Sequence, residues 1–155
     1  MLQSAPASQF TLLSGADILV HGYRPDALER LGLGAQARQQ LRPGLIDVSL
    51  DAYGWSGPWK GRRGFDSLVQ MSCGIASAGM LHYGRDEPTP LPVQALDQAT
   101  GYLMAAAVLN GLTHRLRTGR VQECAECIGY VALLRSGDLN RKVWIQRADG
   151  QIGRA

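Results

Sequence analysis

The sequence predicts an α/β domain in which a short, mostly parallel sheet is flanked by helices. Residues 17–21 and 45–50 are short, largely apolar runs, typical of strands that are buried on both faces. Helical character fills the segment between them, and parallel strands require a crossover connection of this kind. Residues 97–118 repeat apolar side chains at intervals of three and four, as an amphipathic helix does.

The N-terminal part predicts an irregular start followed by two short helices. Residues 1–9 are small and polar, so we expect them to be disordered. Pro25 is well placed to open the first helix, because proline fits the first helical turn. A second helix is expected at 35–41, ending ahead of Pro43.

The two predicted strands also indicate where a ligand would bind. If 17–21 and 45–50 are parallel, their carboxyl ends lie at the same edge of the sheet. Ligands of open α/β sheets bind beyond that edge. The residues directly after the strands are 22–23 and 51–54.

The next segments alternate between loop and helix. Residues 51–64 hold four glycines, a proline and two tryptophans, which predicts a structured loop rather than a linker. Residues 65–75 predict a helix, and 77–92, with three prolines, an irregular segment. Near the C-terminus, 143–146 predict a strand and 148–150 a turn.

The clearest helix is 97–118, which Gly119 is expected to end. Arg115 and Arg117 in its last turn complement the negative end of the helix dipole. We expect it to pack one apolar face on the core: Tyr102, Ala105, Leu109, Leu112 and Leu116.

Composition excludes several classes of protein. The net charge of +3 comes from small groups of basic residues without interleaved aromatics, which argues against a nucleic-acid surface. The longest apolar run, 103–109, is too short to span a bilayer. No signal-peptide pattern follows Met1, so a cytoplasmic location without membrane attachment is expected.

The cysteines do not predict a metal site. Cys124 and Cys127 have the spacing of half a zinc site, but no second pair of ligands accompanies them. His114 is a single possible ligand. We therefore interpret the thiols, with Cys73, as incidental, and expect no metal.

Three stretches carry a resemblance to a known family. They read ADILVHGYRPDALERLGLG (16–34), LRPGLIDVSLDAYGWSGPWKGRRGFD (41–66) and PVQALDQATGYLMAAAVL (92–109). In this order they resemble the family III CoA-transferases. The resemblance implies that 10–120 is a fragment of that family's Rossmann-like large domain, with 121–155 as a divergent tail.

The resemblance implies a catalytic role for Asp97. In the family, the matching aspartate attacks an acyl-CoA and then carries CoA as an aspartyl thioester before passing it to a second carboxylic acid. The helix that follows Asp97 would favour its ionised form. The alternative is a simple helix cap, since aspartate is a favoured N-cap residue.

The resemblance also implies a set of CoA contacts. CoA or acyl-CoA would be a substrate, not a covalently bound cofactor. Arginine forks suit phosphate oxygens, and aromatic faces suit adenine. Taken singly, each residue that matches a CoA-contacting position of the family could also be an ordinary surface or core residue. The residues that match the family's CoA-contacting positions are Gly22, Tyr23, Arg30, Leu31, Arg63 and Phe65.

Phe65 favours a transferase over a related enzyme class. The α-methylacyl-CoA racemases usually have a proton-transferring histidine at this position, and phenylalanine cannot move a proton. His82 and His114 do not match that position and are expected at the surface.

Chain length bears on activity and partners, because members of the family are much longer than 155 residues. A truncated sheet would expose apolar surface, so a homodimer or a complementing polypeptide is expected. Three hypotheses stay open: a working transferase assembled from split chains, a catalytically inactive remnant that binds CoA or a partner, and a degraded fragment.

Overall fold

The computed structural model describes residues 7–24, 26–55 and 58–121, together with the backbone of three further strands. Its centre is a sheet of three parallel strands in the order β1-β2-β3, in which Ile18 pairs with Ile46, and Val48 with Cys124. These strands are β1 (Ile18–His21), β2 (Ile46–Asp51) and β3 (Cys124–Cys127). The α/β class and its parallel sheet are thus confirmed.

Helices precede, connect and follow the first two strands. They are α1 (Ala7–Ser14), α2 (Ala27–Arg30), α3 (Ala35–Leu41), α4 (Asp66–Ser72), α5 (Ile75–Tyr83) and α6 (Ala95–Thr118). Residues 7–9 were expected to be disordered but belong to α1. No helix in the described part of the chain is long and apolar enough to cross a membrane.

An antiparallel pair lies near the C-terminus, formed by β4 (Trp144–Gln146) and β5 (Ile152–Arg154). The expected strand at 143–146 is confirmed for 144–146. The expected turn at 148–150 lies outside the described residues.

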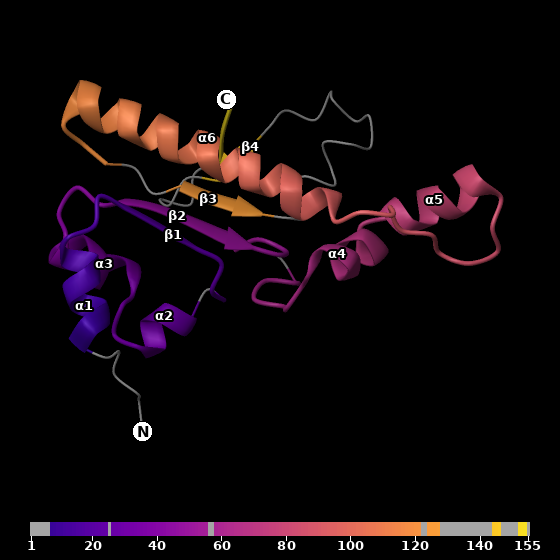
Figure 1. Ribbon diagram of the computed structural model, residues 1–155, viewed down its shortest axis with the longest axis horizontal. Helices are drawn as coiled ribbons and strands as arrows, with labels where there is room; N and C mark the ends of the chain where they lie inside the picture. The colour runs from indigo at the N-terminus through magenta and orange to yellow at the C-terminus, as the bar shows by residue number, and fades with distance from the viewer. Residues whose placement is uncertain are drawn as a thin grey trace.

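The helices lie on both faces of the sheet (Figure 1). On β2, Ile46 and Val48 pack against α6, whereas Asp47 points to the opposite face and bonds Arg38 of α3. Successive strand residues alternate between faces, which accounts for this division. In Figure 1, α4 and α5 extend beyond the carboxyl ends of the strands.

The buried face of α6 differs from the predicted one. Tyr102, Leu109 and Leu116 are 64–78% exposed. The helix instead buries small side chains against the sheet, and a Cβ placed on Gly111 would lie 2.9 Å from Ile46 Cγ2. Small residues let the helix approach β2 closely, so Tyr102, Leu109 and Leu116 point elsewhere. Leu112 is the member of the predicted face that packs, partly buried, against the cluster of Ile46 and Val48. The buried residues of α6 are Leu96, Thr100, Ala107 and Gly111.

The region 65–92 was also only partly predicted. The expected helix at 65–75 ends at Ser72, and Gly74, with a φ of +90°, separates it from α5. α5 occupies part of the segment expected to be irregular, because the three prolines all follow it. Thr89 then returns alongside α5, so that a Cβ on Gly79 would lie 2.0 Å from the Thr89 carbonyl oxygen.

A buried polar network joins β1, β2 and α3. Arg38 Nε donates to Asp47 Oδ2 at 2.6 Å, and His21 Nε2 lies 3.5 Å from Asp47 Oδ1. Burial alone would raise the pKa of Asp47, but the contact with His21 and the charge of Arg38 outweigh it and hold that pKa below its ordinary value. Removing one member of such a buried pair costs about 3–5 kcal/mol of stability. The network fixes the carboxyl end of β1.

Candidate functional site

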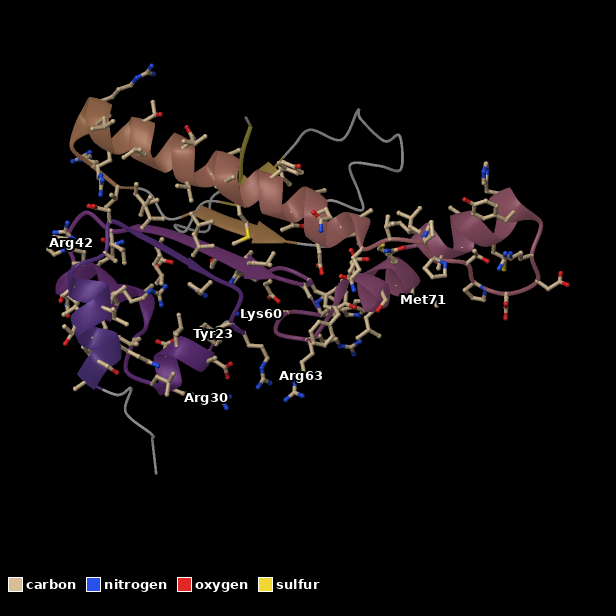
Figure 2. All side chains as sticks on the ribbon, in the orientation of Figure 1. Tyr23, Arg30, Arg42, Lys60, Arg63 and Met71 are labelled. Atoms are coloured by element: carbon tan, nitrogen blue, oxygen red, sulfur yellow. The ribbon has the colours of Figure 1, made fainter. Side chains whose placement is uncertain are left out.

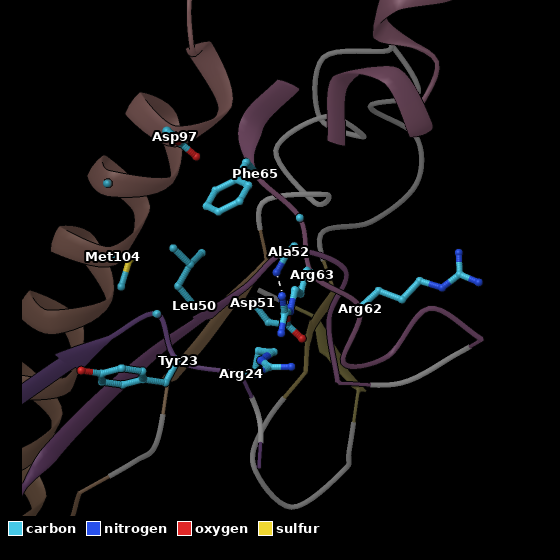
Figure 3. Close-up of a pocket in the computed structure, with 13 residues that line it drawn as sticks. Tyr23, Arg24, Leu50, Asp51, Ala52, Arg62, Arg63, Phe65, Asp97 and Met104 are labelled. Carbon is cyan, nitrogen blue, oxygen red and sulfur yellow. Dashed lines mark hydrogen bonds between the residues drawn. The ribbon is translucent and has the colours of Figure 1, made fainter. Parts of the chain in front are cut away.

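A pocket lies where the sequence predicts a ligand, at the carboxyl ends of β1 and β2 (Figure 3). Its volume is about 520 Å³. The two strand ends, the loop before α4 and the first turns of α6 all contribute to its wall. The lining residues are Gly22, Tyr23, Arg24, Leu50, Asp51, Ala52, Arg62, Arg63, Gly64, Phe65, Asp97, Gly101 and Met104.

Asp97 lies in the first turn of α6 and lines this pocket. It is not the N-cap that the alternative interpretation required, because the helix begins at Ala95 and Gln94 is the capping residue. The Asp97 side chain is exposed, and among the described residues no cation lies within ion-pair distance of it. The simple capping role therefore does not account for this carboxylate.

The electrostatics of Asp97 differ from the expectation that its helix would favour the ionised form. Partial burial in the pocket wall raises the pKa of Asp97, and the neighbouring Asp66 carboxylate raises it further. Desolvation and a like charge both disfavour the ionised carboxylate.

Asp66 positions the start of α6. Its side chain is 1% exposed, and its Oδ2 accepts a hydrogen bond of 2.9 Å from the Asp97 backbone N–H. Gln70, one turn further along α4, donates to Asp66 Oδ1 and to the Val93 carbonyl, and accepts from the Leu91 N–H. The sequence analysis missed this role, although an Asp and a Gln four positions apart in a predicted helix was the available signal.

Four of the six expected CoA contacts line the pocket with Asp97. Tyr23 is 61% exposed and Phe65 75% exposed, so both present aromatic surface to solvent. Arg63 lies two residues before Phe65 in the loop that leads to α4, and Gly22 lies over Leu50, where a Cβ would sit 3.7 Å from Leu50 Cδ2.

The other two expected contacts, Arg30 and Leu31, lie outside the pocket. Arg30 is on α2 (Figure 2). It forms an ion pair with Asp26, four residues earlier. Leu31 is partly buried against the cluster that contains Leu33 and Leu45. Both side chains therefore make their contacts within the N-terminal part of the chain, outside the pocket.

The loop between β2 and α4 is ordered by contacts among its described residues. Tyr53 packs edge-on against Trp59, with ring centroids 5.1 Å apart, and its hydroxyl lies 3.1 Å from Ser72 Oγ. The Arg62 guanidinium lies 5.1 Å from the centre of the Trp59 ring. A Cβ on Gly64 would lie 2.6 Å from Ala52 Cβ, so a glycine is needed where the loop crosses the end of β2.

Besides Arg62, the pocket lining contains two charged residues that the sequence analysis did not select. Arg24 directly follows Gly22-Tyr23, and its position after a strand was the available signal. Asp51 ends the central strand, and its Oδ1 accepts the Ala52 N–H at 2.6 Å. Burial raises the pKa of Asp51, and its Oδ2 has no hydrogen-bond partner among the described residues.

Comparison with known proteins assigns this arrangement to a family. Residues 4–135 match CoA-transferase family III. The chain belongs to that family. It is 35% identical over 117 residues to a probable fatty acyl-CoA transferase of Mycobacterium tuberculosis, covering 76% of this chain and 29% of that protein. The orthorhombic crystal structure of the mycobacterial protein superposes with a TM-score of 0.77 and 34% identity, over 90% of this chain and 40% of that one.

A second relative has a defined transfer reaction in its name. The chain is 34% identical over 111 residues to the beta subunit of succinyl-CoA–L-malate CoA-transferase from Chloroflexus aurantiacus, covering 72% of this chain and 27% of that subunit. The chain thus spans less than a third of the length of these curated relatives.

The family match extends further than the resemblance seen in the sequence. It reaches residue 135 and so includes β3, which lies in the segment 121–155 that we interpreted as a divergent tail. β3 pairs in parallel with the central strand β2. CoA transfer in general, with CoA thioesters as substrates, is therefore the chemistry of the family to which this site belongs.

Proposed function

We propose that this chain moves CoA between carboxylic acids through a thioester on Asp97. The observation that carries the proposal is the convergence of Tyr23, Arg63, Phe65 and Asp97 on one pocket. These residues come from three separate segments: the end of β1, the loop before α4, and α6. The order of motifs in the sequence suggested them, and the fold brings them together.

Two arginines of the pocket suit the nucleotide end of CoA. Arg24 and Arg63 line the pocket, and neither has an acidic partner among the described residues. Unpaired guanidinium groups bind phosphate oxygens through paired hydrogen bonds. The exposed ring of Tyr23, between β1 and Arg24, offers a face on which adenine can stack.

In the first half of the proposed reaction, a carboxylate oxygen of Asp97 attacks the carbonyl carbon of the acyl-CoA. The carbon–sulfur bond breaks, CoA leaves as a thiolate, and a mixed anhydride joins Asp97 to the acyl group. The thiolate then attacks the aspartyl carbonyl. This releases the donor as a carboxylate and leaves CoA bound to Asp97 as a thioester.

The second half runs the same steps with an acceptor. The acceptor carboxylate attacks the aspartyl thioester and expels the CoA thiolate, which forms a second anhydride. The thiolate then attacks the acyl carbonyl of that anhydride, so that a new acyl-CoA leaves and the Asp97 carboxylate is restored. No water or redox partner is consumed.

A second candidate function is CoA binding without turnover. The exposure of Tyr23 and Phe65 favours it, because an open pocket admits water to reactive anhydride and thioester intermediates. Turnover then depends on a covering chain. We propose that a second copy or a complementing polypeptide provides it, since the exposed Tyr102, Leu109 and Leu116 leave an apolar face on α6.

Isotope exchange tests the proposal with one acid. The purified chain should exchange labelled acetate into acetyl-CoA, because the proposed steps are reversible. Asp97→Asn should abolish exchange while calorimetry shows that CoA still binds. Binding without exchange in the wild-type chain would favour the second candidate, and a chain that neither exchanges nor binds CoA would contradict both.

A further inference from the structure

We propose that the α6 wall of the pocket, formed by Gly101 and Met104, binds an apolar acyl group and discriminates against one with a second carboxylate. The inference rests on the proposed function and narrows it to a class of substrate. It depends on three features of the pocket: a bare stretch of helix beside Asp97, apolar neighbours, and the position of the cationic side chains.

The bare stretch of helix is at Gly101, one turn after Asp97. Residues four apart in a helix lie on the same side, so Gly101 lies beside the carboxylate. A Cβ built on Gly101 would meet nothing within 4 Å, and its φ does not lie in the left-handed region. Glycine within a helix costs stability relative to alanine. Neither packing nor backbone conformation among the described residues requires it, so the space is available to a ligand.

The side chains around this space are apolar. Met104 lies on the same side of α6, and Leu50 and Phe65 contribute from β2 and from the start of α4 (Figure 3). Met104 also packs against the cluster around Ile46 and Val48, which anchors it. A flexible thioether adapts to acyl chains of different shape. An acyl group bound to Asp97 would extend over Gly101 towards Met104.

The charges of the pocket are arranged to exclude a second carboxylate. Arg24, Arg62 and Arg63 come from the loops after β1 and before α4, on the side away from α6 in Figure 3. On the α6 side, Asp97 is the charged residue among the described residues that line the pocket, and the buried carboxylate of Asp66, at the start of α4, acts on it as a like charge. A terminal carboxylate there would lose its hydration without gaining a cation and would face like charge.

A matched pair of ligands gives the direct test. Butyryl-CoA and succinyl-CoA have acyl groups of equal carbon number, and only the second has a terminal carboxylate. Each buried methylene contributes about fourfold to affinity. Butyryl has two methylenes more than acetyl, so calorimetry on the wild-type chain should show that butyryl-CoA binds about sixteenfold more tightly than acetyl-CoA. Succinyl-CoA should bind no more tightly than acetyl-CoA.

Two variants then locate the effect. Gly101→Leu keeps a good helix former while filling the space, so it should remove the advantage of butyryl-CoA and leave the affinity for CoA unchanged. Gly101→Ala should give an intermediate loss. Ala106→Leu is the matched control, because it adds the same side chain at an exposed position outside the pocket lining of the same helix, and it should retain the wild-type preference.

The outcomes separate this inference from the proposed function. Equal or tighter binding of succinyl-CoA, or an unchanged butyryl preference in Gly101→Leu, would overturn the acyl assignment while CoA binding still supports the proposed function. If the wild-type chain binds none of the four ligands, both proposals fall together.

Discussion

Asp97 is the residue whose surroundings decide the chemistry. It is exposed to the pocket, its backbone is bonded to the buried Asp66, and its pKa is raised by partial burial and by that second carboxylate. The proposed attack requires the ionised form. The proportion of active chain must therefore fall with decreasing pH at a higher pH than an ordinary aspartate would show, whose reference pKa is 3.8.

Asp66→Asn tests this electrostatic coupling. Removing the neighbouring negative charge lowers the pKa of Asp97, so the acidic limb of the exchange rate should move to lower pH. The measurement is the pH profile of acetate exchange into acetyl-CoA, with Asp86→Asn, an exposed acid outside the pocket lining, as the control. A uniform loss of rate with an unmoved limb would show that Asp66 acts only as a structural anchor.

Arg63 and Arg30 offer a matched comparison of two arginines that the sequence could not rank. Arg63→Ala should weaken CoA binding by about tenfold, since a charged hydrogen bond to phosphate is lost. Arg30→Ala should leave CoA affinity unchanged, because Arg30 lies outside the pocket and pairs with Asp26. Calorimetry at fixed salt measures both, and the reverse ranking would contradict the site.

At the scale of single residues, the pocket lining agrees best with the sequence at positions directly after a strand, and the role of these residues in CoA binding stays a prediction. Tyr23 is in the pocket because parallel strands end at a common edge. Arg30 is the last residue of the four-residue helix α2, and Leu31 follows it directly. A single turn of backbone decides where these two side chains point, and the sequence did not predict that direction. Local pairing with Asp26, visible as an i,i+4 pair, already offered a different partner for Arg30.

At the scale of elements, α6 shows why helix periodicity alone misplaced a face. The large apolar residues of α6 do recur at the intervals expected of a helix. Ala107 and Gly111 nevertheless face the sheet, because their small size permits close contact with β2. Their three/four spacing is as regular as that of Tyr102 and Leu109. The size of the side chains favoured Tyr102, Leu109 and Leu116, which are exposed, and only Leu112 of the predicted face packs against the core. How closely the helix approaches the sheet depends on the three-dimensional fit, which periodicity does not contain.

The loop before α4 depends on Gly64. Gly64→Ala would place a Cβ 2.6 Å from Ala52 Cβ and 3.0 Å from Tyr53, so the loop or the end of β2 must shift. We expect a loss of about 1–3 kcal/mol in unfolding free energy and weaker CoA binding, because Arg63 and Phe65 flank the substitution. Thermal unfolding and calorimetry test this, with Gly15→Ala as the control, where the nearest atom would be 3.8 Å away. Unchanged stability and affinity would mean that the loop does not need this close approach.

At the scale of the whole molecule, the chain holds the pocket but leaves apolar surface uncovered. Val20 of the edge strand β1 is 52% exposed, and it pairs in register with Val48, which packs against α6. Large exposed apolar areas usually mark interfaces. The part of this chain that matches these relatives covers less than a third of their length.

Light scattering should therefore show a dimer or larger assembly at tens of micromolar. Leu109→Lys, together with Leu116→Lys, should shift the chain towards monomer, because both side chains are exposed on α6. Leu81→Lys on α5, also exposed, is the control. A wild-type monomer that binds no dye for exposed apolar surface would contradict this expectation.

The central claim is that Asp97 carries CoA as a thioester, and intact-mass measurement tests it most directly. The chain should be incubated with butyryl-CoA without an acceptor acid and quenched in acid. We expect a mass increase equal to CoA less one water, which borohydride removes by reducing the thioester, with the modification mapped to the peptide that contains Asp97. Asp97→Asn should bind butyryl-CoA and show no adduct. An adduct on another residue, or none on a wild-type chain that binds butyryl-CoA, would contradict the account.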